Sequence, residues 1–479
     1  MRELKASSVA KNVNGSLYGP DNNITGIFNF LNSASPGDAV IRYWIDENGI
    51  KLAAEKEISC IITEEAHGRS IEYSDKLGIS LVIVDKIEMA NAYAIKWAIN
   101  NFASDAKKIV VTGTNGKSTT AHLLFNILNK VGYTTYSNTD AKSEFNTLID
   151  PMVSKQIAEF GKPIEYLVLE VSEVQGLPDR LMENHAYIMT DAICPDIVVV
   201  TNIALDHVNL VNSINEMFKE TSGAIKALKK GYAILNSTDP LVCKMKDFIN
   251  PDVKVIHFGK GEVNFNSDGI YFNSNLIIEK EKLPFKSKHF IYNIMAAVGA
   301  ASALEIPQNS IKKGIESYKP LKRRFSILNK QPLIIDDFAH NPDGIMATIK
   351  NTISNLQGNI IIVSAIRGSR GIDINKFNAE AIVKGLNCEE LSNLKYQLII
   401  TSSNDIVDNA NIVLDVEKEV FVKILEDEGL NYIFKDKLYD AIKYSFLSAK
   451  KDDTILLIGA QGMDPASEVF KKVLSSLNQ

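Results

Sequence analysis

Short apolar runs alternate with amphipathic stretches along most of this chain. Residues 107–111 read KKIVV, a short β-branched run, and residues 121–132 repeat apolar side chains at helical spacing. The pattern predicts a strand followed by a helix, with the turn between them at the helix N-terminus. This turn, Gly113 to Lys117, combines two glycines with a lysine and is the first candidate for chemistry.

The same alternation predicts an α/β protein of three domains. Residues 1–105 carry short apolar runs between helical stretches and predict a small α/β domain. Residues 106–319 add strands apolar enough to be buried on both faces, which a parallel sheet requires, with an antiparallel excursion at 261–285 and two helices at 288–304 and 308–317. Residues 320–479 repeat strands and helices and predict a doubly wound, Rossmann-like domain.

Amino-acid composition argues against several classes of function. The 479 residues carry a net charge of −6, so there is no basic surplus of the kind that binds nucleic acid or anionic membranes. The four cysteines form no CxxC pair, which favours a reduced cytoplasmic protein. No apolar run approaches the roughly 18 residues of a membrane span. We expect a monomeric protein that acts on small soluble substrates, without membrane insertion.

The turn has the chemistry of a phosphate-binding loop. Amides at a helix N-terminus favour an anion, Lys117 can reach a β- or γ-phosphate, and the Ser118 hydroxyl suits a magnesium ion. Val111 stands where the GxxxxGK[ST] consensus has its first glycine. The alternative is a glycine-rich turn with a surface lysine. The residues expected to bind nucleotide here are Gly113, Thr114, Asn115, Gly116, Lys117, Ser118 and Thr119.

Polar residues also follow two strands of the predicted central sheet. Glu170 ends the run YLVLE, and Asp206 and His207 follow VVVTNIAL closely. Because open α/β sheets place ligands at the carboxyl ends of their strands, these side chains could hold a divalent metal. Taken singly, Glu170 could cap a helix and His207 could be a hydrogen-bonded structural residue. Together with the loop, they favour a metal site.

Six motifs in order resemble the Mur ligase family. They are TGTNGKST at 112–119, EVS at 170–172, TNIALDH at 201–207, KHFIYNIMAA at 288–297, RRF at 323–325 and DDFAHNPDG at 336–344. The resemblance implies three domains and an ATP-dependent reaction that joins an amino acid to a carboxylate through an acyl phosphate. It covers nearly the whole chain, and it implies ATP and Mg²⁺ as cofactors.

The resemblance implies roles for individual residues. Lys117 and the loop amides would hold the phosphates, Ser118 one magnesium, and Glu170 with His207 a second. Asn293 would reach the adenine, and Arg324 and Asp337 would contact nucleotide from the third domain, where His340 and Asn341 extend the motif. The implied catalytic set is Lys117, Glu170, His207 and Arg324. Substrate contacts are expected from Asn146, Thr147, Arg367, Arg370, Ser403, Asn404 and Asp405.

Several positions depart from the family pattern. Leu31 and Asn32 replace a Ser-Arg pair of the N-terminal domain, Arg323 replaces the glycine of a Gly-Arg motif, and Phe290 replaces an asparagine. These changes favour a divergent branch resembling the archaeal pseudomurein peptide ligases, of the tripeptide-forming type, with a nucleotide-linked peptide as acyl substrate. The alternatives are a bacterial muramoyl-peptide ligase, a folylpolyglutamate synthase and a non-catalytic nucleotide-binding protein.

One segment bears on the amino acid that is added. Where diaminopimelate-adding ligases carry Asp-Asn-Pro-Arg, this chain has residues 403–406, SNDI. With Asp405 and Asp408 nearby and no arginine, charge pairing favours a cationic side chain such as that of lysine. Arg367 or Arg370 could hold the α-carboxylate. The alternative is that both aspartates are solvated loop residues.

Most Mur ligases carry a carbamylated lysine beside the second metal, and the resemblance places Thr221 at that position. A threonine cannot carry a carbamate, so we expect activity to be independent of bicarbonate. The alternative is that Lys219 or Lys226, within about one and a half helical turns, is the modified residue.

Overall fold

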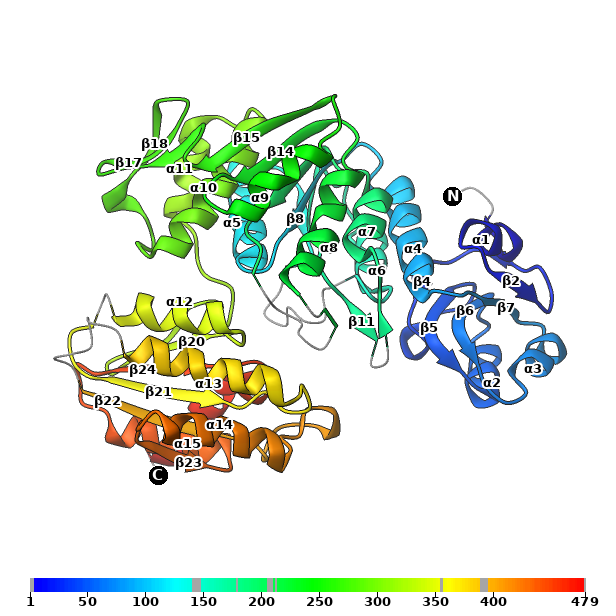
Figure 1. The fold of residues 1–479 in the computed structure, drawn as a ribbon. Helices are drawn as coiled ribbons and strands as arrows, with labels where there is room; N and C mark the ends of the chain where they lie inside the picture. Colours follow the sequence, from blue (N-terminus) through cyan, green and yellow to red (C-terminus); the bar gives the residue numbers. More distant parts are fainter. Residues whose placement is uncertain are drawn as a thin grey trace.

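The computed structural model describes residues 4–139, 148–177, 180–204, 210–211, 213–353, 356–387 and 395–477. Three mixed or parallel sheets of five, nine and six strands are arranged along the chain, each with helices against it. The N-terminal sheet lies beside the central one, and the C-terminal sheet lies beneath the central one (Figure 1). The predicted α/β class is confirmed, while the predicted domain boundaries stay predictions.

The central sheet has the strand order β18-β17-β16-β15-β14-β13-β8-β10-β9. Its strands from β9 to β15 pair in parallel, as predicted. These strands are β8 (Lys107–Thr112), β9 (Thr135–Ser137), β10 (Tyr166–Glu170), β13 (Ile197–Val200), β14 (Gly231–Asn236) and β15 (Val253–Gly259). The predicted antiparallel excursion is β16 (Val263–Phe265), β17 (Gly269–Phe272) and β18 (Asn275–Glu279), which extends the edge of the same sheet.

Successive residues of β8 point to opposite faces of this sheet, and each face has its own apolar core. Ile109 and Val111 pack under helices α5 (Lys117–Val131), α10 (Lys288–Ala303) and α11 (Gln308–Glu316). Val110 packs on the other face. The helices of that face are α4 (Ile87–Phe102), α6 (Met152–Ala158), α7 (His185–Ile193) and α8 (Ile214–Ala227). Burial on both faces explains why the strands read as continuous apolar runs.

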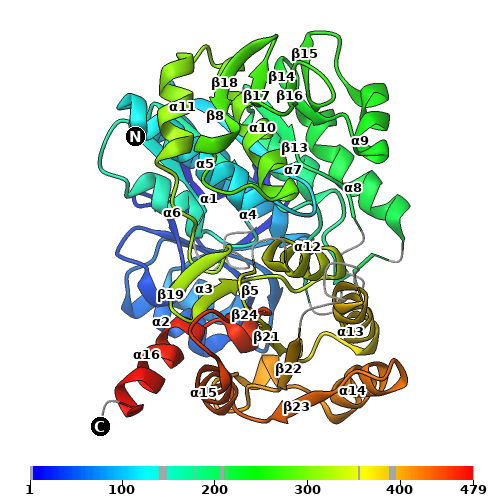
Figure 2. The ribbon, with the colours of Figure 1, turned by 90° about the vertical axis from the view of Figure 1, so that its left-hand side faces the viewer.

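The C-terminal sheet has the order β19-β20-β24-β21-β22-β23, in which only β19 is antiparallel to its neighbour. Its strands are β19 (Ser326–Lys330), β20 (Leu333–Asp337), β21 (Ile360–Ala365), β22 (Tyr396–Thr401), β23 (Tyr432–Lys435) and β24 (Thr454–Ile458). Helices α12 (Pro342–Ile353), α13 (Ile372–Leu386) and α14 (Asp415–Asp427) cover one face; α15 (Leu438–Ser448) and α16 (Ala466–Leu477) cover the other. The sheet is therefore doubly wound. Seen from the side in Figure 2, α12 lies on the part of this domain nearest the central one.

The N-terminal sheet, β2-β7-β6-β5-β4, is parallel except for β2. Its strands are β2 (Ser16–Tyr18), β4 (Phe28–Asn29), β5 (Ala39–Ile45), β6 (Cys60–Ala66) and β7 (Ser80–Ile83). The shorter elements around it are β1 (Leu4–Lys5), β3 (Asn23–Ile24), α1 (Ala6–Asn12), α2 (Glu47–Glu55) and α3 (Ser70–Leu77). Helix α4 contributes apolar residues to both the N-terminal and the central core, which ties the two parts together.

A small hairpin from the central part strengthens this connection. It consists of β11 (Gly176–Leu177) and β12 (Arg180–Leu181), and Leu177 and Met182 pack into the N-terminal core. The Arg180 guanidinium donates to the carboxylates of Glu64, on β6, and Glu88, on α4, at 2.6–3.1 Å. Within the described part of the chain, no helix is long and apolar enough to span a membrane.

Candidate active site

The predicted strand–turn–helix around the glycine-rich loop is confirmed. Strand β8 ends at Thr112, α5 begins at Lys117, and Gly113 and Gly116 both have positive φ angles, 115° and 87°. Both positions are also crowded, because a Cβ at Gly113 would meet the Thr201 hydroxyl and one at Gly116 would meet the Asn293 amide oxygen. Glycine is required at both for conformation and for space.

The loop is held by the segment that follows β13. The Thr114 amide donates to the Asn202 carbonyl oxygen at 2.9 Å, and the Asn115 amide donates to the Asn202 side-chain oxygen at 3.0 Å. The Asn202 side-chain amide donates in return to the Asn115 carbonyl oxygen at 2.7 Å. Asn202 was not among the predicted site residues. Its place directly after an apolar strand, inside a motif already singled out, was the signal that could have found it.

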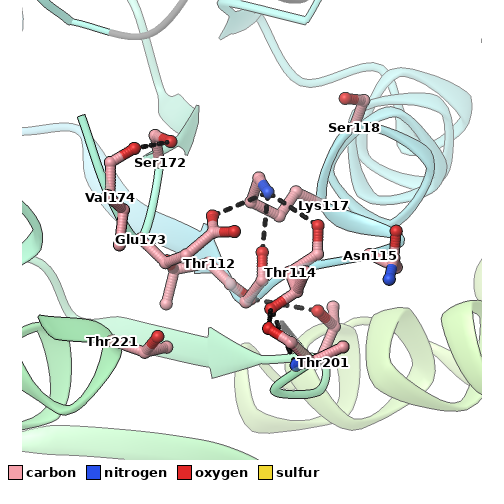
Figure 3. A network of polar contacts seen from close by, with 12 residues as sticks. Thr112, Thr114, Asn115, Lys117, Ser118, Ser172, Glu173, Val174, Thr201 and Thr221 are labelled. Carbon is pink, nitrogen blue, oxygen red and sulfur yellow. Dashed lines mark hydrogen bonds and ion pairs between the residues drawn. The ribbon is translucent and has the colours of Figure 1, made fainter. Parts of the chain in front are cut away.

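Lys117 points back into its own loop (Figure 3). Its ammonium donates to the Gly113 carbonyl at 2.7 Å, the Thr114 carbonyl at 2.9 Å and the Glu173 carboxylate at 2.8 Å. The Lys117 side chain is 14% exposed, and that of Glu173 is completely buried. Glu173, the charged partner of Lys117, was not among the predicted site residues, although it lies only three residues after Glu170.

Glu170 ends β10, the strand next to β8 in the sheet. Its carboxylate is buried, and its Oε2 atom has no hydrogen-bond partner. Burial raises the pKa of Glu170, while the positive charges of Lys117 and Arg324 act in the opposite direction. An oxygen that is buried and unsatisfied in this way is costly unless a ligand completes its coordination.

The C-terminal part docks directly onto the loop. Arg324 donates to the Ser118 hydroxyl at 3.2 Å, and Asn341 donates to the Asn115 side-chain oxygen at 3.2 Å. The Arg324 guanidinium stacks over the Phe338 ring, 4.7 Å from its centroid. Burial lowers the pKa of Arg324 despite the opposing charges of Glu170 and Asp337.

A cavity of about 860 Å³ opens between the loop and the C-terminal part. Asp337 faces it; burial raises its pKa, and its carboxylate accepts from the Thr348 hydroxyl and the Ala339 amide, both at 3.0 Å. Phe290, at the position of a family asparagine, also lines it. The predicted nucleotide-binding residues on its wall are Asn115, Gly116, Thr119, Asn293, Arg324 and Asp337, joined by His340 and Asn341.

Arg323, at the position of the glycine of the Gly-Arg motif, has a positive φ of 59°, which is a conformation that favours glycine. Its buried guanidinium donates to Asp336 at 3.1 Å, to Asp464 and to the Gly459 carbonyl at 2.6 Å. Burial raises the pKa of Asp336 to about 6 against the opposing charge of Arg323. These bonds offset the strain of a left-handed arginine and fix the linker to the C-terminal sheet.

The predicted amino-acid contacts lie in loops at the carboxyl ends of β21 and β22. Arg370 donates to the Asn411 side chain at 3.2 Å, and Arg367 is buried. Ser403 is buried and Asn404 donates to the Asp436 carbonyl. The two carboxylate oxygens of Asp405 accept the amides of Leu438 and Tyr439, so this side chain caps α15. The substrate roles of these residues stay predictions.

The candidate residues Asn146, Thr147, Asp206 and His207 lie outside the described residues. The Thr221 hydroxyl is buried and donates to the Met217 carbonyl at 2.6 Å. The alternatives Lys219 and Lys226 are exposed, and the Lys226 ammonium lies over the Phe248 ring.

A second, smaller cavity of about 350 Å³ lies between the N-terminal and central parts. Leu31 and Asn32, which replace the family Ser-Arg pair, line it together with Arg42, Tyr43 and Pro151. Tyr43 also donates to Glu65 at 2.9 Å.

The donor set suits Mg²⁺. Within the described ranges there is no cluster of three His, Cys, Asp or Glu side chains that could hold a metal ion. Mg²⁺ does not need one, because it keeps several waters and is bound by one or two carboxylates and substrate phosphates. The Ser118 hydroxyl and the unpartnered oxygen of Glu170 are the hard oxygen ligands that it prefers.

These features define a class: a three-part α/β protein whose glycine-rich strand–turn–helix loop faces a doubly wound part across a cavity of about 860 Å³. Comparison with known proteins agrees. Residues 111–301 match the Mur ligase middle domain, and residues 323–461 match the Mur ligase glutamate ligase domain. The chain belongs to the Mur ligase family.

Individual relatives span most of the chain. It is 27% identical over 417 residues to a UDP-N-acetylmuramoyl-L-alanyl-D-glutamate–2,6-diaminopimelate ligase of Caldanaerobacter subterraneus, covering 81% of this chain and 80% of that protein. The MurF ligase of Thermotoga maritima in complex with ADP has a TM-score of 0.68 at 17% identity, over 95% of this chain and 99% of that one. A type C pseudomurein peptide ligase of Methanothermus fervidus has a TM-score of 0.56 at 19% identity, over 90% of this chain and 100% of that one.

Proposed function

We propose that this protein is an ATP-dependent ligase that adds an amino acid to a nucleotide-activated peptide precursor of a cell-wall polymer, with release of ADP and phosphate. The single observation that carries the proposal is the phosphate-binding loop, with Lys117 and Ser118, closed against Arg324 from the C-terminal part. In the proposed complex, nucleotide phosphates would lie between the central and C-terminal parts, beside the buried carboxylate of Glu170.

The reaction needs activation of a carboxylate, because a carboxylate and an amine do not condense at neutral pH. The acyl carboxylate attacks the γ-phosphate, and the amino acid captures the acyl phosphate. Lys117, turned from Glu173 toward the phosphates, and Arg324 would stabilise the charge on the transferred phosphoryl group. Ser118 and Glu170 would hold magnesium, which supplies further charge neutralisation when bound.

The docked C-terminal part also protects the reactive intermediate. Arg324 and Asn341 reach the loop from the C-terminal side, so both parts form walls of the cavity. Exclusion of water prevents hydrolysis of an acyl phosphate before the amine arrives. Asn293 and Asp337 on the cavity wall are suited to the adenosine.

For the acyl substrate we propose a nucleotide-linked peptide of pseudomurein type. The smaller cavity, where Leu31 and Asn32 replace the Ser-Arg pair of muramoyl-peptide ligases, supports a changed nucleotide-sugar group. A bacterial-type muramoyl-peptide ligase is the second candidate, favoured by the 27% identity to a diaminopimelate-adding relative.

The test is ADP release measured with purified protein, ATP and Mg²⁺. ADP should appear only when an amino acid and an acyl acceptor are both present. Muramoyl-peptide and non-muramoyl nucleotide peptides, tried in parallel, separate the two candidates. ADP release that does not depend on the amino acid or on the acyl acceptor would contradict the ligase function.

The added amino acid is tested in the same assay. The acidic segment around Asp405 and Asp408 favours lysine over glutamate by charge pairing. The Asp405 carboxylate already caps α15. The side chain of a lysine substrate would therefore be attracted by the charge of Asp405 without direct contact and by the carboxylate of Asp408. Selective incorporation of glutamate would refute this prediction.

A further inference from the structure

Glu173 is a buried carboxylate that has no function in the proposed reaction as described above. It follows β10 by three residues, its side chain is completely buried, and its Oε2 atom accepts from the Lys117 ammonium at 2.8 Å. Its negative charge reaches Glu170 and contributes to the raised pKa of that carboxyl. Two carboxylates and one ammonium therefore share the space beside the loop.

One oxygen of Glu173 and one oxygen of Glu170 lack a hydrogen-bond partner, although Glu173 is paired with Lys117. Glu173 Oε1 is buried without a hydrogen-bond partner, and so is Glu170 Oε2. A finished structural ion pair satisfies its remaining lone pairs, because an idle oxygen away from water is costly. These two buried oxygens, one at the end of β10 and one three residues later, are hard ligands of the kind that a divalent cation prefers.

Nucleotide binding would change the hydrogen bonds of the Lys117 ammonium. The Lys117 ammonium uses its three hydrogens on Gly113, Thr114 and Glu173, so it cannot reach a phosphate without giving up some of these bonds. When it turns to the β- and γ-phosphates, Glu173 is left buried without its countercharge. A buried charge in that state must gain another cation or take up a proton.

We propose that Glu173 is a ligand of the divalent cation, masked by Lys117 in the free enzyme and exposed to the metal when nucleotide draws Lys117 away. The inference rests on the proposed function, because it takes the loop to bind nucleotide phosphates. It also explains how the site holds enough negative charge although Thr221 offers only a hydroxyl that is bonded to Met217. Nucleotide and metal then bind cooperatively.

The test measures Mn²⁺ binding by the EPR signal of free Mn²⁺, with and without a non-hydrolysable ATP analogue, so that no turnover is needed. In the wild type, the analogue should strengthen Mn²⁺ binding. Glu173→Gln keeps the shape and should weaken Mn²⁺ binding in the presence of the analogue by about 10- to 100-fold. The matched control is Glu279→Gln, which neutralises another lysine-paired carboxylate of the central sheet, at 2.8 Å from Lys312, and should bind like the wild type.

A second variant keeps the test sharp if Glu173→Gln folds poorly. Lys117→Met removes the masking ammonium, so the free protein should bind Mn²⁺ at least about tenfold more tightly than the wild type without any nucleotide. Adding Glu173→Gln to Lys117→Met should abolish the gain. Thermal unfolding of each variant verifies that the fold is retained.

The possible results distinguish failure of the proposed function from failure of the inference about Glu173. A wild type that binds neither analogue nor Mn²⁺ would overturn the proposed function and this inference with it. A wild type that binds both, with Glu173→Gln equal to it and no gain in Lys117→Met, would overturn the inference alone and leave Glu173 as a residue that only orients Lys117.

Discussion

Arg323 and Lys117 are two cationic side chains whose positions are set by carboxylates from other segments of the chain. Arg323 has a left-handed backbone conformation, and its guanidinium is paired with Asp336 and Asp464. Lys117 keeps its place at the start of α5 while its ammonium is held by Glu173. In both cases a partner carboxylate distant in the sequence holds the cationic group.

The first prediction concerns Lys117. Lys117→Ala removes the charge that accompanies phosphoryl transfer, so turnover should fall by about 10²- to 10³-fold. ADP release in the complete reaction measures it, and circular dichroism shows whether the fold is retained. Lys130→Ala, at the exposed end of the same helix, is the control and should keep full activity. Comparable turnover in the two variants would contradict the role of Lys117.

The second prediction concerns the absence of a carbamate. Thr221 is buried where the family lysine would stand, whereas Lys219 and Lys226 are exposed. Activity should therefore be independent of added bicarbonate, measured in buffers freed of carbon dioxide. A carbamate on either lysine in a well-defined density map, or rescue of a Lys219→Ala or Lys226→Ala variant by short-chain acids, would decide against it.

At the scale of elements, carboxylates that accept backbone amides organise the loops that follow the C-terminal strands. Glu417, in the first turn of α14, accepts the backbone amides of Ser369, Arg370, Gly371 and Leu414 at 2.7–3.0 Å. It thereby fixes the loop that carries the candidate amino-acid ligands and leads into α13. Asp405 does the same for the start of α15.

The third prediction tests that positioning. In Glu417→Gln an amide group replaces one acceptor oxygen, so two loop amides lose their partner and the loop shifts. The KM for the amino acid should rise about tenfold while the KM for ATP stays within a factor of two, by analogy with lost supporting contacts at other sites. Glu419→Gln, exposed on the same helix, is the control. Equal changes in both KM values would contradict a role confined to the amino-acid loop, and a fall in apparent kcat with both KM values unchanged would indicate a loss of folded protein instead.

The fourth prediction concerns the hairpin that joins the central and N-terminal parts. Arg180→Ala leaves Glu88, completely buried, and Glu64 without their cation, which should cost about 3–5 kcal/mol in the free energy of unfolding. Arg69→Ala removes an exposed pair with Glu72, which solvent screens, and should cost much less. Urea unfolding of both variants measures the difference, and equal losses would contradict a structural role of the Arg180 cluster.

At the scale of the whole molecule, the active site exists only where separate parts meet. Arg324 and Asn341 reach the loop from the C-terminal side, and the Arg323 pairs with Asp336 and Asp464 anchor the linker that brings them there. The stability of this anchor should therefore depend on pH through Asp336.

The fifth prediction follows from the sign of that dependence. The pKa of Asp336 is about 6 in the folded protein against an ordinary value of 3.8. The stability that it contributes is complete below pH 3.8 and is lost as pH rises through 6. Arg323→Met removes the countercharge, so it should destabilise by about 3–5 kcal/mol at pH 8 and by less at pH 5, where Asp336 is protonated.

Urea unfolding at the two pH values measures the effect, with Lys322→Met, an exposed neighbour, as the control. An equal loss of stability at pH 5 and pH 8 would show that Asp336 does not titrate in this range.

The amino-acid sequence by itself determined the α/β class, the parallel central sheet and the strand–turn–helix of the loop. These features depend on hydrophobic period and on glycines in a left-handed conformation, which are local properties of the chain. It also determined the family, and it placed Asn293, Arg324 and Asp337, which the structure brings to one cavity wall. Strand ends of a parallel sheet share one edge, so a motif at a strand end already indicates its location.

Only the tertiary structure decided which charges meet. The pairing of Lys117 with Glu173, the hold of Asn202 on the loop and the contact of Asn341 with Asn115 join segments that are 56, 87 and 226 residues apart. Nothing in the local pattern distinguishes Glu173 from a solvated glutamate, or Asp405 from a ligand of substrate. Burial and the partners that packing supplies set the role of a charged side chain, and both are consequences of the assembled fold.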